Sequence, residues 1–143
     1  MKTKSLYTQF LAIGIIMLFS LFSEPVAAQG RGEDRRPTEH NLVIKIIDNE
    51  WRVVLRDDES RSTVIAKRGD RIRWSVEDSD ASFQFEDENL FGNNTRTVKA
   101  GNLLVLAVGD GARVGSYTYA VFIHKDLRFA RGESPPRIFV ARM

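Results

Sequence analysis

Apolar and polar residues alternate along most of the chain, with the two-residue period of β-strands. The alternation is cleanest over residues 71–77, where Ile72, Trp74 and Val76 share one face and charged or polar residues share the other. Turn residues separate these segments, and no stretch after residue 41 has a helical period of useful length. The pattern predicts strands over residues 42–47, 51–55, 62–66, 71–77, 82–86, 95–98, 103–108, 115–124 and 137–141. Eight or nine short strands at this spacing are typical of an all-β sandwich or barrel.

The alternation also predicts which side chains meet in the interior. Within residues 115–124, Tyr117, Tyr119, Val121 and Ile123 fall on one face, and smaller or more polar residues fall on the other. Combining this face with the apolar faces of two further strands predicts a core around Trp74. The expected members are Ile72, Trp74, Val76, Phe83, Phe85, Tyr117 and Tyr119.

The first 28 residues have the order of features found in a secretory signal peptide. A short basic start precedes an apolar run over residues 10–22, and small residues ending at Ala28 offer a cleavage site. The alternative is an uncleaved membrane anchor, for which the run is short because a span needs about 20 residues. We therefore predict a signal peptide over 1–28, a flexible charged linker over 29–40 and a domain over 41–143. The protein is expected to be exported to the periplasm or outside the cell, with no membrane contact after cleavage.

Composition limits the classes of partner and the means of stabilisation. Loss of residues 1–28 removes Lys2, Lys4 and Glu24, which lowers the formal net charge from +2 to +1. A balance this close to neutral gives no basic field for nucleic acid, so we expect no nucleic-acid binding. The chain contains no cysteine, so no disulfide braces the fold and the apolar core must stabilise it alone.

Several motifs, taken in order, resemble those of the cupredoxins. Residues 115–124 contain Gly115, Tyr117, Tyr119 and His124 at the spacing of the penultimate cupredoxin strand. Residues 64–74 resemble the strand, Gly-Asp turn and aromatic-ended strand of that family, and residues 81–85 resemble the segment that carries its first copper histidine. The resemblance covers most of the domain and implies a Greek-key β-sandwich of cupredoxin type.

The same resemblance implies that the type 1 copper site is missing. That site needs two histidines, one cysteine thiolate and a weak axial ligand. Here the first histidine position falls on Ala81, or on Ser82 if the alignment shifts by one residue, and the cysteine position falls on Val121. Only His124 matches a ligand position, and no methionine follows it in residues 125–129. We expect no cofactor, and no intense visible band when copper is added.

His124 supports two interpretations. It is either a strand-end histidine that is hydrogen-bonded or exposed, or a ligand in a different kind of metal site, with His40 or nearby carboxylates. One histidine without a cysteine or a second ordered histidine favours the first interpretation.

The loop after His124 is the part of the sequence that indicates a partner. It runs to Pro136, longer than a hairpin needs, and long loops in compact domains are often functional. In cupredoxins the corresponding loop docks partners, and the candidate partner-binding residues are His124, Leu127, Arg128, Phe129 and Arg131. The alternative is a lid, with Leu127 and Phe129 folded down over the open end of the barrel.

These features predict an exported, copper-free cupredoxin-like module that binds a protein partner and is not an enzyme. A metal-handling protein that uses His124 in a non-blue site is the first alternative. A small hydrolase is a remote second alternative, because no catalytic motif is present and any Ser-His-Asp triad would need His124. The sequence names neither the partner nor the oligomeric state.

Overall fold

The computed structural model describes residues 35–133 and 135–143, and residues 36–143 form one compact unit. The predicted signal peptide and residues 29–34 of the predicted linker lie outside the described residues. Among those that are described, no helix is long and apolar enough to cross a membrane.

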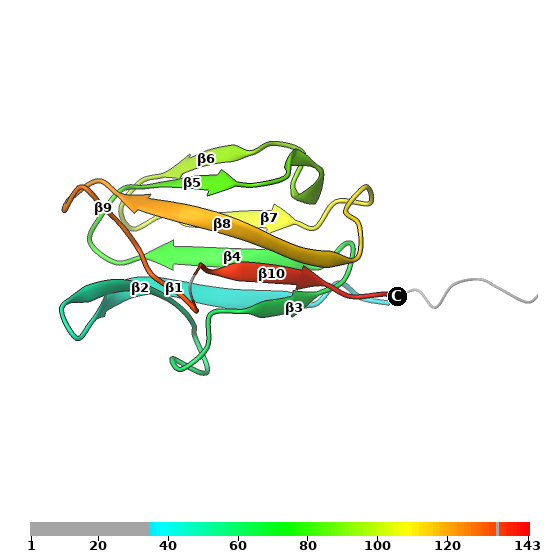
Figure 1. The fold of residues 1–143 in the computed structure, drawn as a ribbon, viewed down its shortest axis with the longest axis horizontal. Helices are drawn as coiled ribbons and strands as arrows, with labels where there is room; N and C mark the ends of the chain where they lie inside the picture. Colours follow the sequence, from blue (N-terminus) through cyan, green and yellow to red (C-terminus); the bar gives the residue numbers. More distant parts are fainter. Residues whose placement is uncertain (1–34, 134) are drawn as a thin grey trace, which may run out of the picture. The chain divides into compact units, whose positions relative to one another are not determined.

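Ten strands and one short 3-10 helix make up the domain (Figure 1). The strands are β1 (Glu39–Ile47), β2 (Glu50–Leu55), β3 (Val64–Ala66), β4 (Arg71–Val76), β5 (Ala81–Phe85), β6 (Thr95–Val98), β7 (Leu103–Ala107), β8 (Gly115–Ile123), β9 (Arg128–Phe129) and β10 (Arg137–Val140). The helix η1 (Glu88–Leu90) lies between β5 and β6.

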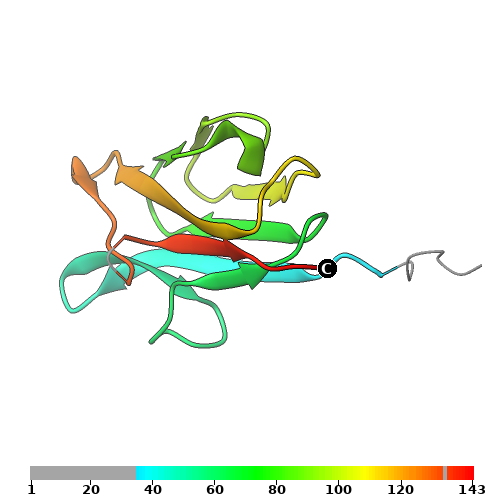
Figure 2. The ribbon, with the colours of Figure 1, turned by 45° about the vertical axis from the view of Figure 1, so that its right-hand side comes forward.

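The strands form two sheets that enclose one core. One sheet has the order β2-β1-β4-β7, and the other has the order β3-β10-β8-β5-β6, with β9 added beside β8. In Figure 1, β8 crosses obliquely in front of β4 and β7 of the other sheet, and Figure 2 shows the same sheets after a partial turn about the vertical axis. Parallel pairing of β1 with β4 and of β10 with β3 requires connections that cross between the sheets. The architecture confirms the predicted all-β Greek-key sandwich.

All nine predicted strands are present, and their ends differ by at most three residues. The largest differences are at β1, which begins at Glu39, and at β3, which begins at Val64. The last two residues of the predicted linker, Glu39 and His40, therefore belong to the first strand. They pair with β4, opposite Arg71 and Ile72. This pairing extends β1 into residues that the local sequence pattern had assigned to the linker. The two-residue strand β9 was not predicted, because its pattern is too short to give a period.

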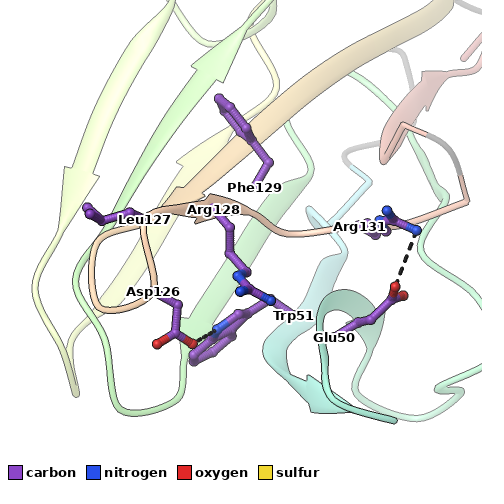
Figure 3. Close-up of a pocket in the computed structure, with 7 residues that line it drawn as sticks. All are labelled: Glu50, Trp51, Asp126, Leu127, Arg128, Phe129 and Arg131. Atoms are coloured by element: carbon purple, nitrogen blue, oxygen red, sulfur yellow. Dashed lines mark hydrogen bonds and ion pairs between the residues drawn. The ribbon is translucent and has the colours of Figure 1, made fainter.

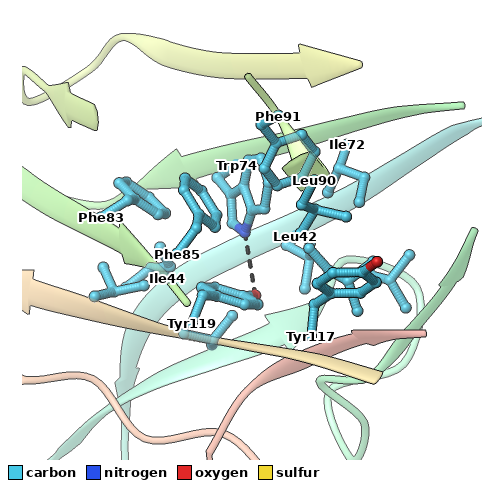
Figure 4. Packing of buried hydrophobic residues seen from close by; sticks show 14 of the residues in the cluster. Leu42, Ile44, Ile72, Trp74, Phe83, Phe85, Leu90, Phe91, Tyr117 and Tyr119 are labelled. Atoms are coloured by element: carbon cyan, nitrogen blue, oxygen red, sulfur yellow. Dashed lines mark hydrogen bonds between the residues drawn. The ribbon is translucent and has the colours of Figure 1, made fainter. Parts of the chain in front are cut away.

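Trp74 occupies the centre of the core, as predicted (Figure 4). Its ring centroid lies 5.6 Å from that of Phe83 and 5.8 Å from those of Phe91 and Tyr119, and all three pairs have edge-on geometry. Every predicted core member is buried, including alternate residues of β8 from Tyr117 to Ile123. Helix η1 adds two side chains that the sequence pattern did not assign, Leu90 and the following Phe91.

Candidate functional site

The ends of β5 and β8 bring together the residues equated with copper ligands. Ala81 pairs with Ile123, and Phe83 pairs with Val121, so these positions lie on neighbouring antiparallel strands. Ala81 and Val121 are fully buried in the core, and their aliphatic side chains cannot ligate a metal. His124, which follows β8, is exposed and does not point into that core. The fold thus places these positions together, but only one of them carries a ligating side chain.

His124 is held by hydrogen bonds on the open face of the sheet. Its Nε2 lies 2.8 Å from Ser82 Oγ, and its amide donates to the carbonyl of Asp80 at 3.1 Å. Its ring also packs edge-on against Phe122, with centroids 5.7 Å apart. This arrangement agrees with the interpretation of His124 as a hydrogen-bonded strand-end histidine.

The structure separates the two histidines, so the suggestion that His40 joins His124 is wrong. His40 lies opposite Ile72 at the start of β4, and its Nε2 is 3.3 Å from Asp70 Oδ2. His124 donates its amide to the carbonyl of Asp80, which lies in the connection after the other end of β4. Within residues 35–133 and 135–143, no group of three or more histidine, cysteine or acidic residues is placed to hold a metal ion.

The loop after β8 forms a hairpin with β9 and then crosses to the other sheet. Ala130 donates its amide to the carbonyl of Val121, which continues the pairing with β8. Arg131 donates to the carbonyl of Trp51 and accepts from the amide of Val53, both at 2.7 Å. The loop therefore links β8 of one sheet to β2 of the other and closes this end of the sandwich.

Trp51 and Ala130, rather than Leu127 and Phe129, are the buried apolar residues at this closed end. Trp51 is buried, and its Nε1 donates to Asp126 Oδ2 at 2.6 Å (Figure 3). Leu127 and Phe129 are 76% and 61% exposed. The lid alternative is wrong, because the hydrogen bonds of the loop to β2 fix its backbone and leave both side chains on the outside.

Around these side chains lies a surface groove of about 500 Å³. Its lining is Glu50, Trp51, Asp126, Leu127, Arg128, Phe129 and Arg131. Arg131 forms an ion pair of 3.3 Å with Glu50, whereas Arg128 forms none with the described residues (Figure 3). We call the predicted set His124, Leu127, Arg128, Phe129 and Arg131 the β9 patch. Leu127, Arg128, Phe129 and Arg131 line this groove together, whereas His124 is not among its lining residues.

A carboxylate just beyond the β9 patch anchors the loop to the β2–β3 connection. Glu133 Oε2 accepts the amides of Ser62 at 3.0 Å and Thr63 at 2.8 Å, and its own amide donates to Ser62 Oγ. Gly132 is required at this contact, since a Cβ there would lie 2.8 Å from both Ser62 Oγ and Pro136 Cβ. The sequence marked Gly132 only as part of a long loop, because nothing local indicates which residues approach it.

The anchor should make part of the stability depend on pH. Hydrogen bonds from the Thr63 side chain and from the amides of Ser62 and Thr63 lower the pKa of Glu133 from 4.5 to about 2. A carboxyl with a lowered folded-state pKa stabilises the protein above its unfolded pKa, and the contribution is lost as pH falls from 4.5 towards 2. Melting temperatures of the wild type and of Glu133→Ala should therefore differ at neutral pH and converge over that interval. Because Glu133 is exposed to solvent, the difference should be small.

Glu133→Gln is the matched control, since it retains one acceptor oxygen without a titratable charge. Its difference from Glu133→Ala should not change between pH 4.5 and 2. A difference between wild type and Glu133→Ala that stays constant over this interval would contradict the assignment.

Comparison with known proteins finds similarity only among solved structures, at low sequence identity. No protein-family model and no curated protein sequence matches the chain. Solved structures that are similar include a mutant of amicyanin in its reduced Cu(I) form, with 13% identity and a TM-score of 0.39, covering 76% of this chain and 87% of that one. They also include Fet3p, a multicopper oxidase that functions in iron import, with 13% identity, a TM-score of 0.39 and coverage of 75% and 23%. The blue copper oxidase of Nitrosomonas europaea has 12% identity, a TM-score of 0.36 and coverage of 71% and 41%.

The fold is the two-sheet Greek-key β-sandwich that the resemblance to cupredoxins implied, and Ala81 and Val121 supply no ligand for type 1 copper. The strand order and the juxtaposition of Ala81, Val121 and His124 match what the sequence resemblance implied. The chain spans less than half the length of the two oxidases.

Proposed function

We propose that the protein is an exported accessory module that binds an acidic protein partner through the β9 patch. The observation that carries this proposal is the exposure of Leu127 and Phe129 on one hairpin. Burying a Leu or Phe side chain is worth about 1.5–3 kcal/mol, and the fold does not gain that energy at either position. A partner that covers both side chains would gain it.

The backbone at Leu127 supports the same conclusion. Its φ is 51°, in the left-handed region that glycine and asparagine normally occupy. A large apolar residue in this conformation is unfavourable for the isolated domain by about 1–2 kcal/mol. The hairpin therefore presents Leu127 to solvent in a backbone conformation that folding alone does not favour. Unfavourable backbone conformations of this kind are concentrated at binding sites.

The charges around the patch suit an acidic partner. Arg128 and Lys125 are exposed and form no ion pair with the described residues, and Arg131 is paired only with Glu50. Phe129 packs edge-on against Phe122, with centroids 5.2 Å apart, which continues the apolar strip onto β8. An apolar centre with a positive rim is complementary to a surface with an apolar pocket and acidic edges.

Replacement of both Leu127 and Phe129 by alanine should abolish partner binding without destabilising the domain. Both side chains are mostly exposed, so the melting temperature should remain near that of the wild type. The matched control is Ile65→Ala with Phe139→Ala, because these two residues are also exposed and apolar and pair across β3 and β10. The measurement is the recovery of proteins bound to the native exported protein in its producing cells. The control pair should recover the same partner as the wild type, and the patch pair should lose it.

Two further outcomes decide the proposal. Arg128→Glu should weaken binding of the same partner and reduce its dependence on salt, since a rim charge acts through screened electrostatics. A large fall in melting temperature for the patch pair, with the same proteins recovered, would contradict docking at this surface.

The two alternative functions receive less support. A metal-handling role would need ligands beside His124, and the nearest hydrogen-bond partner of its ring is the hydroxyl of Ser82. The Ser82–His124 contact resembles part of a hydrolase triad, and Asp80 lies nearby, but the Asp80 carboxylate accepts hydrogen bonds from Lys99 and the amide of Ala100. The Ser82–His124 contact lies on an open sheet face, and the grooves at the β9 patch and elsewhere are lined by other residues. We therefore propose no catalytic role.

A further inference from the structure

Strand β7 is an edge strand with no charged residue. It pairs with β4 on one side, and no described strand pairs with its other side. Leu103 and Val105 are 51% and 42% exposed on the outer face of the sheet. The other long edges carry charges that discourage further pairing, namely Glu50 and Arg52 on β2 and Arg96 on β6, and β3 is only three residues long.

The backbone of β7 has polar groups available for another strand. Val108 donates its amide to the carbonyl of Asp70 at 2.8 Å, and hydrogen-bonded pairs alternate along an antiparallel ladder. By this alternation, the backbone groups of Leu106 and Leu104 bond to β4. The amides and carbonyls of Leu103, Val105 and Ala107 then face away from β4, towards the free edge. An uncharged edge with apolar side chains and an open row of donors and acceptors is a template for strand addition.

We propose that β7 pairs antiparallel with β7 of a second copy of this chain, about a two-fold axis through Val105. In this register Val105 lies opposite its own symmetry mate, and Leu103 lies opposite Ala107 of the other copy. The three outward residues of each strand then form hydrogen-bonded pairs, and the four-stranded sheets join into one continuous sheet. The exposed side chains of Leu103 and Val105 become contiguous across the axis, as a two-fold interface requires.

The charges at the ends of β7 select a second copy in this direction. Asp110 lies exposed in the turn after the strand, and Lys99 lies in the turn before it, where it pairs with Asp80 at 2.7 Å but remains 74% exposed. Antiparallel pairing about Val105 places the Lys99 turn of one copy beside the Asp110 turn of the other, at both ends. The nearest like charges, Arg73 on each β4, remain three strand spacings apart, or about 14 Å, which exceeds the screening length in physiological salt. Arg73 is also paired with Glu39 at 3.2 Å.

The first test is the mass in solution of the full chain, in the form in which its producing cells export it. Sedimentation should show a concentration-dependent dimer for the wild type. Val105→Lys places two lysines opposite each other at the axis and should weaken dimerisation at least about tenfold. Ile65→Lys, which charges an equally apolar and exposed residue on edge strand β3, should leave the dimer unchanged. A wild type that remains monomeric at all concentrations, or a dimer that survives Val105→Lys, would overturn the proposal.

The second test fixes the register and does not depend on how Val105→Lys folds. The chain contains no cysteine, so one introduced cysteine can form a disulfide only between copies. Residues in a hydrogen-bonded antiparallel pair have Cα atoms about 5.5 Å apart, within disulfide range. Val105→Cys should therefore give a covalent dimer on mild oxidation, whereas Leu103→Cys should do so only when combined with Ala107→Cys. Equal cross-linking by Val105→Cys and Leu103→Cys alone, or capture of an unrelated extended peptide by a monomeric chain, would contradict pairing between copies.

Discussion

Replacement of Trp74 by alanine is expected to lower the free energy of unfolding by about 3–5 kcal/mol. Trp74 is completely buried, and its indole packs against four aromatic rings from the opposite sheet and from the residue after η1. Truncation removes that apolar contact and leaves a cavity that rigid neighbouring strands cannot fill. The domain has no disulfide to compensate, so equilibrium unfolding in denaturant should report the loss directly.

The substitution Trp74→Phe separates the packing contribution from the polar one. The Trp74 indole donates a hydrogen bond of 3.2 Å to the Tyr119 hydroxyl, and burial raises the pKa of that phenol, so it stays neutral. Phenylalanine keeps much of the apolar volume but leaves the Tyr119 hydroxyl without this donor. Its loss of stability should therefore be clearly smaller than that of Trp74→Ala. A loss below about 1 kcal/mol for Trp74→Ala would contradict the central position of this residue.

Replacement of Asp70 by alanine should have the second largest effect, lowering the free energy of unfolding by about 2–4 kcal/mol. Asp70 is buried in the turn between β3 and β4, and its carboxylate accepts the amides of Thr38 at 3.0 Å and Lys67 at 2.9 Å. Hydrogen bonds to a charged group are worth about 1.5–3 kcal/mol, and partly buried amides that lose their acceptor are destabilising. The carboxylate also joins residues far apart in sequence, because Thr38 precedes β1.

The substitution Asp70→Asn tests whether the acceptor oxygens carry the effect. Asparagine has the same size but only one acceptor oxygen, so it should lose about half as much stability as alanine. Hydrogen exchange at the Thr38 and Lys67 amides should rise in both variants. Unchanged exchange at these amides in Asp70→Ala would show that the carboxylate does not hold the segment before β1.

The sequence determined the strands and the interior of this protein. A strand must alternate its side chains between two faces, so Ile72, Trp74 and Val76 could be assigned to the core from their spacing alone. The same rule placed alternate residues of β8 inside, and the burial of Tyr117 and Tyr119 confirms it. The lack of type 1 copper ligands at Ala81 and Val121 is also visible in the sequence, because such a site depends on the identity of a few residues.

Local pattern could not assign residues whose environment comes from another part of the chain. The segment around His40 resembled a charged linker, and only its pairing with β4 shows that it belongs to the first strand. The sequence pattern assigned Asp70 only to a turn. Its role as a buried hydrogen-bond acceptor depends on the amide of Thr38, 32 residues away.

The orientation of the loop after β8 was decided by tertiary structure alone. Sequence identified Leu127 and Phe129 but left open whether they fold inward or face solvent. Hydrogen bonds of Arg131 to β2 and of Asp126 to Trp51 resolve the question, because they connect the loop to the opposite sheet. Residue type and spacing determine which faces of a strand are apolar, whereas the direction of a loop depends on contacts between residues about 75 positions apart, as between Trp51 and Asp126.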